Sequence, residues 1–338
     1  MKDVAIKANV STATVSRVLN GNYPVSKEIM ERVKQAIEDL QYKPNSIARS
    51  LRIKRSNLIA IVVTDIRNPY YISIAREIDN CLFDDGYNLI FCSTDESAEK
   101  EKKILEMLIE KNVDAVIISP CTQDPENLMP LIKENIFTVL IDRDVPFLNL
   151  NYVGEQNFNE SYSLTEYLIK KGHKKIAIMN GTLDSSTGME RYMGYQSALK
   201  QYDIPLCDDL ILSGGYYERQ AFQTMNELFL SNNGIKPTAI VSCNNLMSEG
   251  IMRAAIKNHK RIPEDISLVS FGEIVNQEFI KTKITCIKQK ENIIGENVSK
   301  IVLNKLGKNS EENLQKKISI SNQLIEGNSV LSLNGENS

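Results

Sequence analysis

The residues best suited to chemistry lie in one short segment near the N-terminus, residues 10–21. Its apolar side chains recur at helical spacing and turn one side of a helix inward: Val15, Val18 and Leu19. The opposite side presents hydroxyl, methyl and guanidinium groups: Thr12, Ala13, Ser16 and Arg17. A guanidinium group can donate to both acceptor atoms on the edge of a guanine, and hydroxyl groups at a helix N-terminus suit phosphate. This chemistry indicates a helix that reads duplex DNA; the plain alternative is a small solvated three-helix domain.

Three short helices within residues 3–40 are expected to position that segment. Ser11 follows a tight turn and is expected to cap the second helix, and Ser26 to cap the third. The inward positions of the first and third helices again follow helical spacing: Val4, Ala5 and Ala8, then Ile29, Val33, Ala36, Ile37 and Leu40. Pro44-Asn45 breaks the pattern and opens a short segment of helical composition, residues 46–52.

Beyond Asn57, short apolar runs alternate with amphipathic helices. The strands expected are 58–64, 87–93, 115–119, 138–142, 175–180, 239–242 and 267–271, with a final strand at 318–325. The helices expected are 71–85, 98–111, 157–171, 189–201, 218–230 and 248–257. Such alternation predicts parallel sheets covered by helices on both faces. The number of units indicates two sheets, and so an α/β body behind an all-α head.

The net charge of −3 hides an asymmetry along the chain. Residues 1–56 hold eleven Lys and Arg against five Asp and Glu, whereas the remainder holds 29 against 38. A basic head on an acidic body favours a head that meets a polyanion. No apolar run is long enough for a transmembrane helix and no secretory pattern opens the chain, so we expect a cytoplasmic protein. The six scattered cysteines lack metal or redox spacing and are expected to be reduced.

Patterns typical of enzymes do not occur in the sequence. The two histidines, His173 and His259, are expected to be solvated residues at helix ends. The glycine- and serine-rich stretch 181–188 is not followed by the Gly-Lys-Ser/Thr of a phosphate-binding loop. Gly-x-Ser-x-Gly, Cys-x-x-Cys and His-Glu-x-x-His are also missing. We therefore expect no enzyme, no catalytic residue, no metal and no cofactor.

Longer motifs are informative together. The head carries Asp3-Val4-Ala5, then Ala8-x-Val10-Ser11-x-x-Thr14-Val15-Ser16-Arg17-Val18-Leu19-Asn20-Gly21, followed by Tyr42-x-Pro44-Asn45-x-x-Ala48-x-Ser50-Leu51. The body carries Asn68-Pro69-Tyr70-Tyr71, Ile141-Asp142-Arg143, Gly172-His173-Lys174-Lys175, Arg191-x-x-Gly194-Tyr195 and Ile262-Pro263-Glu264-Asp265. These motifs are similar to those of the LacI/GalR family of transcriptional regulators, and the resemblance covers nearly the whole chain.

The resemblance implies a role for each matching residue of the head and hinge. Base contacts are expected from Thr12, Ala13 and Arg17, and phosphate contacts from Ser11, Thr14, Ser16 and Asn20. Hinge contacts in the minor groove are expected from Asn45, Ala48, Leu51 and Arg52. Of these, Leu51 matches the apolar wedge that kinks the duplex. A helix of about seven residues is marginal alone in water, so the hinge is expected to fold only when two chains and DNA meet.

For the body, the resemblance implies the periplasmic-binding-protein fold: two doubly wound parallel-sheet lobes joined by three crossovers, with a ligand between them. The domains expected are a helix-turn-helix head (1–44), a hinge helix (45–56), a first lobe (57–154 and about 273–303), a second lobe (155–272 and about 304–330) and a loose tail (331–338). The residues expected to line the cleft are Asp65, Tyr71, Ser93, Pro120, Asp142, Arg143, Arg191, Tyr216, Asn244 and Gly272.

Some of these cleft assignments have plain alternatives. Tyr71 and Tyr216 suit core packing equally well, and Asp65 and Asp142 suit turn caps at strand ends. Where the family often shows Phe-Asp-Asp, this chain has Phe271-Gly272-Glu273, and Asn244-Asn245 replaces a more usual Asn-Asp. Fewer carboxylates beside the two arginines favour an anionic effector, such as a sugar acid or sugar phosphate, over a neutral sugar.

Together these features predict a repressor, expected to control carbohydrate-use genes. It is expected to bind a palindromic operator in double-stranded DNA as a homodimer, to be switched by a small-molecule carbohydrate-type effector, and to have no membrane partner. The end of the chain lacks leucine heptads, which favours a dimer over a tetramer. Family members usually carry several residues before the motif that begins here at Asp3, so we expect the true start upstream; the alternative is that the head binds DNA more weakly. The alternative function is a solute-binding protein of a sugar transport system, against which the basic head argues.

Overall fold

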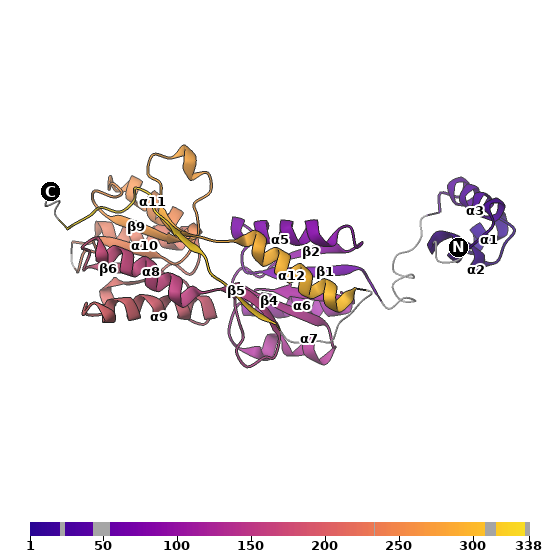
Figure 1. Cartoon of the computed structure of the whole chain (residues 1–338), viewed down its shortest axis with the longest axis horizontal. Coiled ribbons are helices and arrows are strands. Elements are labelled where there is room, and N and C mark those ends of the chain that lie inside the picture. The colour runs from indigo at the N-terminus through magenta and orange to yellow at the C-terminus, as the bar shows by residue number, and fades with distance from the viewer. Residues whose placement is uncertain (21–23, 43–54, 233, 308–315, 335–338) are drawn as a thin grey trace. The chain divides into compact units, whose positions relative to one another are not determined.

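The computed structural model describes residues 1–20, 24–42, 55–232, 234–307 and 316–334 (Figure 1). The chain forms two units, the head (Met1–Ser56) and the body (Asn57–Ser338). The described part of the head holds α1 (Lys2–Lys7), α2 (Thr12–Asn20) and α3 (Lys27–Asp39). Their apolar faces meet in a small core of buried residues: Val4, Ala5, Ala8, Val15, Val33 and Ala36.

Both predicted caps of the head are confirmed. The Ser11 Oγ accepts from the Thr14 amide at 3.1 Å at the start of α2, and the Ser26 Oγ accepts from the Ile29 amide at 3.4 Å at the start of α3. One inward assignment is wrong, because Leu40 is the C-cap residue that follows Asp39 at the end of α3, and it is 41% exposed.

The first lobe of the body is built on a parallel sheet of strand order β11-β5-β4-β3-β1-β2. Its strands are β1 (Leu58–Val63), β2 (Asn88–Ser93), β3 (Ala115–Ile118), β4 (Phe137–Ile141), β5 (Asn151–Glu155) and β11 (Lys317–Ile320). Helices α5 (Pro69–Leu82) and α12 (Glu291–Leu306) share a core with Ile61 on one face, and α6 (Ala98–Glu110) and α7 (Met129–Lys133) share a core with Val62 on the other. Neighbouring residues of β1 therefore point to opposite faces, as a strand covered on both sides requires.

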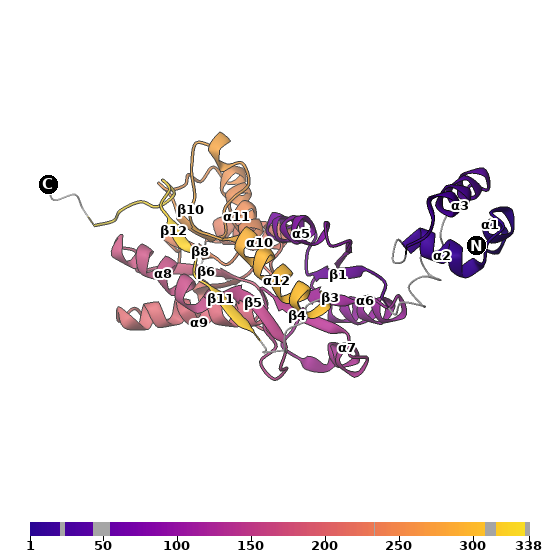
Figure 2. The same ribbon diagram turned by 45° about the vertical axis from the view of Figure 1, so that its right-hand side comes forward.

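The second lobe repeats this plan on a sheet of order β12-β10-β9-β8-β6-β7. Its strands are β6 (Ile176–Asn180), β7 (Ile211–Ser213), β8 (Ala239–Ser242), β9 (Ser267–Phe271), β10 (Thr285–Lys288) and β12 (Gln323–Ile325), of which only β12 runs antiparallel among those described. Two packed helix pairs lie on different sides of β6 and β8: α8 (Asn157–Lys170) with α9 (Ser186–Gln201), and α10 (Glu218–Leu230) with α11 (Asn245–Lys257) (Figures 1 and 2). Short 3₁₀ helices are η1 (Pro125–Asn127), η2 (Asp208–Leu210) and η3 (Gln277–Phe279).

Within the residues that the structure describes, the chain passes between the two lobes at three places. These are the end of β5, the end of β10, and the step from β11 to β12 at residues 321–322. The positions differ from the expected boundaries near 273 and 304. Because β10 pairs with β9, residues 273–288 stay in the second lobe, and because β11 pairs with β5, the chain returns to that lobe only after Ile320.

Two regions that were expected to be solvated are packed against the second lobe. The Leu331 amide donates to the Ser267 Oγ at 2.9 Å and the Leu333 amide to the Lys171 carbonyl at 2.7 Å, so residues 331–334 are not a loose tail. His173 is 1% exposed, and its ring nitrogens lie within hydrogen-bond distance of the Thr238 hydroxyl and the Leu331 carbonyl. No helix in the described ranges is long and apolar enough to cross a bilayer.

Candidate DNA-binding face and ligand cleft

The outward face of α2 carries the residues from which base contacts are expected. Thr12, Ala13 and Arg17 are all exposed, and Ala13 and Arg17 are four residues apart, on one side of the helix. Val15, between them, is fully buried. The N-terminal half of α2 is thus free to enter a major groove, whose width admits an α-helix.

The residues expected to contact phosphate are placed less uniformly. Ser11 is exposed and Thr14 half-buried at the start of α2, and their hydroxyl oxygens lie 2.9 Å apart. Ser16, however, is only 7% exposed, so its expected position on the outer face is wrong. It precedes Leu19 by three residues and follows Val15 directly, which places it at the edge of the inward stripe. Asn20 ends α2, and its side chain lies outside what the structure describes, as do all four hinge residues: Asn45, Ala48, Leu51 and Arg52.

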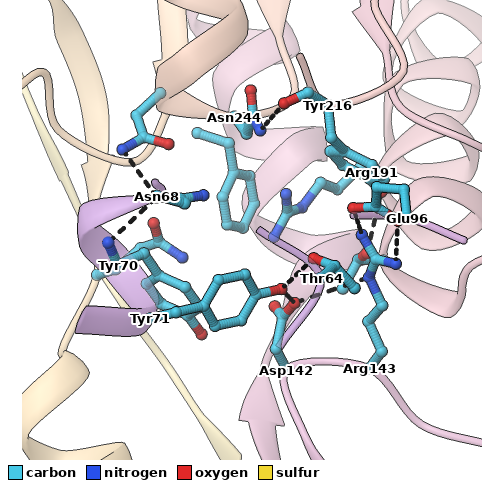
Figure 3. Close-up of a pocket in the computed structure, with 14 residues that line it drawn as sticks. Thr64, Asn68, Tyr70, Tyr71, Glu96, Asp142, Arg143, Arg191, Tyr216 and Asn244 are labelled. Atoms are coloured by element: carbon cyan, nitrogen blue, oxygen red, sulfur yellow. Dashed lines mark hydrogen bonds and ion pairs between the residues drawn. The ribbon is translucent and has the colours of Figure 1, made fainter. Parts of the chain in front are cut away.

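In the body, a cavity lies between the two lobes, at the carboxyl ends of their strands (Figure 3). Its volume is about 30 Å³, room for about one or two water molecules. The lining residues come from both lobes: Thr64, Asn68, Tyr70, Tyr71, Glu96, Asp142, Arg143, Thr187, Arg191, Tyr216, Asn244, Asn245, Phe271 and Gln289. The lobes are therefore closed around a site that side chains nearly fill.

Six of the ten residues expected in the cleft line this cavity: Tyr71, Asp142, Arg143, Arg191, Tyr216 and Asn244. The other four do not. Asp65 accepts two hydrogen bonds from the Arg67 guanidinium at 2.9 Å, and Ser93 donates to Asp95 at 2.7 Å. Pro120 contributes its carbonyl oxygen to Arg143 at 3.3 Å, and Gly272 turns the chain after β9 with φ of +91°. Strand-end position alone did not separate cavity residues from turn residues.

Tyr71 and Asp142 form the floor of the cavity in the first lobe. The Tyr71 hydroxyl donates to the Asp142 Oδ2 at 2.8 Å and lies 3.1 Å from the Ser119 hydroxyl. Burial, and next the charge of Asp142, raises the pKa of Tyr71 well above its ordinary value. The Tyr71 hydroxyl therefore stays protonated and holds the carboxylate in place.

Arg143 is the more heavily paired of the two arginines. Its Nη1 and Nη2 donate to the two carboxylate oxygens of Glu96 at 2.8 and 2.7 Å, and both side chains are less than a tenth exposed. The guanidinium carbon also lies 4.7 Å from the centre of the Tyr216 ring in the other lobe. Arg143 Nε has no hydrogen-bond partner among the described residues, with the Asp142 Oδ2 at 3.9 Å. Few carboxylates were expected beside the two arginines, and the pairing of Glu96 with Arg143 shows that this expectation was wrong.

Arg191 is held differently. Its guanidinium lies 3.6 Å from the centre of the Phe271 ring, its Nε donates to Asn157 at 2.9 Å, and its Nη1 donates to the Cys243 carbonyl. The closest carboxylate is Glu155, at 3.9 Å from Nη2. Burial, and next the neighbouring Glu160, raises the pKa of Glu155 to about 8. Burial thus disfavours the charged form of Glu155, and the direct contacts of the Arg191 guanidinium are an aromatic ring, an amide oxygen and a carbonyl oxygen.

Sequence reasoning missed eight cavity residues: Thr64, Asn68, Tyr70, Glu96, Thr187, Asn245, Phe271 and Gln289. Tyr70 carries a signal of its own, since its hydroxyl is buried and has no hydrogen-bond partner among the described residues. Asn68, Asn245 and Phe271 lie inside sequence motifs that resemble the family, but no role in the cleft was predicted for them. No group of three or more His, Cys, Asp or Glu that suits a metal ion occurs in the described ranges.

Comparisons with known proteins agree on both units. Residues 1–45 match the bacterial regulatory proteins of the lacI family, and residues 56–326 match the periplasmic binding proteins and sugar binding domain of the LacI family. The chain is 33% identical over 337 residues to the HTH-type transcriptional repressor PurR of Haemophilus influenzae (strain PittEE), with 98% of this chain and 99% of that protein covered. It is 31% identical over 314 residues to the repressor of the same name from Histophilus somni (strain 2336), covering 92% and 93%.

Solved structures give the same result. The Lac repressor dimer bound to operator and the anti-inducer ONPF superposes with a TM-score of 0.82 at 25% identity, covering 97% of this chain and 98% of that one. The complex of the regulator CelR with cellobiose gives a TM-score of 0.73 at 24% identity, over 97% and 98%, which supports the fold. With both units matched over nearly their full length, the chain belongs to the LacI family of bacterial regulatory proteins.

Proposed function

We propose that this protein is a transcriptional repressor that binds operator DNA through α2 and is switched by a small molecule in the cavity between its lobes. The observation that carries the proposal is the exposed face of α2, formed by Thr12, Ala13 and Arg17, within a region that matches the lacI regulatory family. A cavity closed by polar side chains from two lobes supplies the place for a switch.

The proposed assembly is a homodimer on a palindromic operator. One recognition helix reads a few base pairs, which is too short a sequence to specify one site in a genome. Two-fold symmetry doubles the site, and the solved Lac repressor was a dimer on its operator. In this proposal Ser11, Thr14 and Asn20 hold phosphates, and Ser16 is left out because it is buried. The hinge residues Asn45, Ala48, Leu51 and Arg52 enter the minor groove.

The proposed effector is a carbohydrate-type molecule. Carboxylate, guanidinium, amide and phenol groups converge in the cavity, and the aromatic ring of Phe271 lies among them. Hydroxyl groups on a ring-shaped ligand suit such a mixture, because each hydroxyl both donates and accepts. The regulator CelR was solved with cellobiose, a further support for this class. We propose that the regulated genes serve carbohydrate use.

We also propose that the protein is not an enzyme and that it works in the cytoplasm, associated with the nucleoid. The curated relatives are named as transcriptional repressors. Residues 1–45 match a family of regulatory proteins, and transport by a solute-binding protein does not require such a region. The match therefore argues against the solute-binding alternative.

The test is selection of duplexes from a random DNA pool by the full-length protein, followed by binding of the selected duplex in rising salt. A symmetric sequence is expected to emerge, and its affinity is expected to fall about a thousandfold or more between about 50 and 200 mM salt, as phosphate contacts release counterions. A scrambled duplex of equal composition is the control. If no symmetric sequence is enriched, with or without candidate sugars, the proposal is wrong.

A further inference from the structure

One ion pair in the cavity joins groups that a ligand would be expected to use. Glu96 and Arg143 meet through two hydrogen bonds of 2.7 and 2.8 Å, with side chains 9% and 3% exposed (Figure 3). A forked guanidinium is well shaped to bind a carboxylate or phosphate of a ligand. Here that end of Arg143 is already occupied by the protein's own carboxylate.

The chain directs Glu96 into the cavity by an uncommon turn after β2. Asp95 and Glu96 have φ of +51° and +52°, a left-handed conformation that residues with a Cβ adopt only when their surroundings hold them. The surroundings do so here. The Glu96 amide donates to the Thr64 carbonyl at 3.2 Å, Lys100 pairs with the Asp95 carboxylate at 2.6 Å, and the Tyr217 hydroxyl donates to the Asp95 carbonyl at 2.7 Å.

The charges that line the cavity balance without a ligand. Arg143 and Arg191 bring two positive charges, and Glu96 and Asp142 bring two carboxylates. Glu155, behind Arg191, adds no positive charge in either protonation state. An acidic effector would therefore make a closed, nearly dry site net negative and would lie close to two carboxylates, which is costly for a buried charge.

The polar atoms that still lack partners suit an uncharged ligand. Among the described residues that line the cavity, the buried polar atoms without a hydrogen-bond partner are the Tyr70 hydroxyl, which both donates and accepts, and Arg143 Nε, which donates. Each can satisfy one hydroxyl group of a polyol. Neither the Tyr70 hydroxyl nor Arg143 Nε offers the pair of parallel donors that a carboxylate or phosphate requires. The parallel donors of Arg143 are Nη1 and Nη2, and both donate to Glu96.

We infer that Glu96 occupies an anion-binding position on Arg143 and thereby restricts the effector to an uncharged polyhydroxy compound. The inference rests on the proposed function in one respect, that this cavity is the effector site. It reverses the expectation of an anionic effector, which the sequence had suggested before Glu96 could be placed beside Arg143.

The test removes the Glu96 side chain and offers free acetate ions in place of its carboxylate. Glu96→Ala removes the atoms of an acetate ion from a buried position, so acetate is expected to bind in the gap and raise the thermal midpoint of the full-length variant toward that of the parent. Acetamide, its uncharged isostere, is expected to bind about tenfold more weakly or not at all. Both titrations are run at constant ionic strength, and the parent protein is expected to respond to neither.

Two further variants separate charge from space. Glu99→Ala removes the exposed partner of Lys103 and is expected to be insensitive to acetate. Glu96→Ala with Arg143→Met removes both charges and is expected to lose the acetate response while folding. If Glu96→Ala alone does not fold, the variant is refolded in acetate and in acetamide, and the yield of folded protein replaces the thermal midpoint. Recovery in acetate and not in acetamide is then the expected result. Equal rescue by acetate and acetamide, or no rescue by either, overturns the inference.

Sugars complete the experiment. The inference is also overturned if an anionic sugar stabilises the parent protein and the effect is lost in Arg143→Met. The anionic sugars to be tested are D-glucuronate, D-gluconate and glucose 6-phosphate. The failure of the proposed function is a separate result, because it is read from DNA selection and not from acetate. If acetate rescues the variant but no duplex is enriched, the anion-binding position on Arg143 is supported and the proposed repressor function is wrong.

Discussion

Two buried guanidinium groups face the same cavity, and the chain neutralises them in different ways. Arg143 is paired through both terminal nitrogens with the carboxylate of Glu96. Arg191 lies on the Phe271 ring and donates to an amide and a carbonyl, which leaves its Nη2 with Glu155 at 3.9 Å. Arg191 is therefore the guanidinium better placed to donate to an effector hydroxyl, and Arg143 the one that sets the charge of the site.

Glu155 should make stability depend on pH. Its pKa is raised to about 8 by burial and by Glu160, from an ordinary value of 4.5. The folded state therefore holds a proton that the unfolded state releases between about pH 4.5 and pH 8, and the free energy of unfolding falls as pH rises through this window. Glu155→Gln mimics the protonated form, so we expect the variant to gain stability relative to the parent toward pH 8, by the order of a few kcal/mol.

The measurement is urea unfolding of both proteins at several pH values across about two units either side of neutrality. The exposed Glu110→Gln serves as the control, because it changes a carboxylate without altering a buried site. Any constant offset between parent and Glu155→Gln reflects lost hydrogen bonds to Gln289 and Asn322. Parallel pH profiles for the two proteins would contradict the proton-binding role of Glu155.

Arg17 is expected to read a base and not merely to hold the backbone. It is exposed on the face of α2 that also carries Ala13. For Arg17→Ala we expect a loss of about 1–3 kcal/mol at one base pair of each half-site, so that substitutions at that pair cease to matter. Competition between the selected duplex and its single-base variants measures this, with Lys200→Ala in α9 as the control. A loss that is uniform across all duplexes would assign Arg17 to phosphate instead.

At the scale of elements, glycines set how closely the helix pairs of the second lobe approach. Gly194 of α9 lies against the backbone of α8, and a Cβ there would overlap the Phe158 carbonyl oxygen and lie 2.9 Å from the Tyr162 nitrogen. Gly250 of α11 repeats the arrangement against Glu218 and Phe222 of α10. In both pairs the obstacle is backbone, which cannot rotate away as a side chain can.

Gly194→Ala is therefore expected to destabilise the second lobe. Alanine favours a helix over glycine by about 1 kcal/mol, but forcing α8 and α9 apart costs about 1–3 kcal/mol or more in lost packing. We expect the cost of the steric overlap to exceed the gain in helix propensity, so that the free energy of unfolding falls. Chemical denaturation measures the change, with Lys200→Ala, exposed on the same helix, as the control. A variant at least as stable as the parent would show that the two helices can separate without loss.

Sequence patterns predict the position of most elements, but they do not predict which sheet a strand joins. Apolar runs and helix caps located most strands and helices, because burial on both faces leaves a continuous apolar run. The run 318–325 was expected to be one strand, yet β11 and β12 lie in different sheets, with the chain crossing at 321–322. An apolar run records burial but not the identity of the neighbouring strand.

The cavity residues follow the same division. Arg191 and Asp142 were predicted because they stand in family motifs, whereas Glu96 was not given a role in the cavity. Its partner Arg143 is 47 residues away, and the left-handed turn at Asp95 decides where its side chain points. Neither feature has a local signature, since Asp and Glu after a strand are equally typical of a solvated turn. Long-range pairing of polar groups is set by the assembled lobes.

At the scale of the whole body, several hydrogen bonds join the two lobes. The Tyr217 hydroxyl donates to the Asp95 carbonyl at 2.7 Å, the Gln123 amide to the Asp184 carbonyl at 2.9 Å, and the Asp144 amide to the Ser186 Oγ at 2.9 Å. With a cavity of about 30 Å³ there is no room for a sugar in this closed form. The lobes must separate to admit an effector, and an effector shifts that equilibrium only by its differential affinity for the two forms.

Tyr217→Phe should therefore favour the open form while leaving each lobe intact. The lost hydrogen bond is worth about 0.5–1.5 kcal/mol, so opening is expected to become about two- to tenfold more frequent. The amides of Gln123 and Asp144 donate across the cleft and report opening directly through hydrogen exchange. We expect both to exchange faster in the variant.

The Thr94 amide, which donates to Val63 inside the first lobe at 2.9 Å, should be unchanged. Tyr202→Phe removes a comparable hydrogen bond to Glu166 within the second lobe, and it should leave the exchange of both reporter amides at the parent's rate. Faster exchange at Thr94 as well would mean general unfolding and not lobe separation. If the Gln123 and Asp144 amides exchange as in the parent, the bond from Tyr217 does not hold the lobes together. The closure would then rest on the other bonds between the lobes, among them those that the Gln123 and Asp144 amides donate.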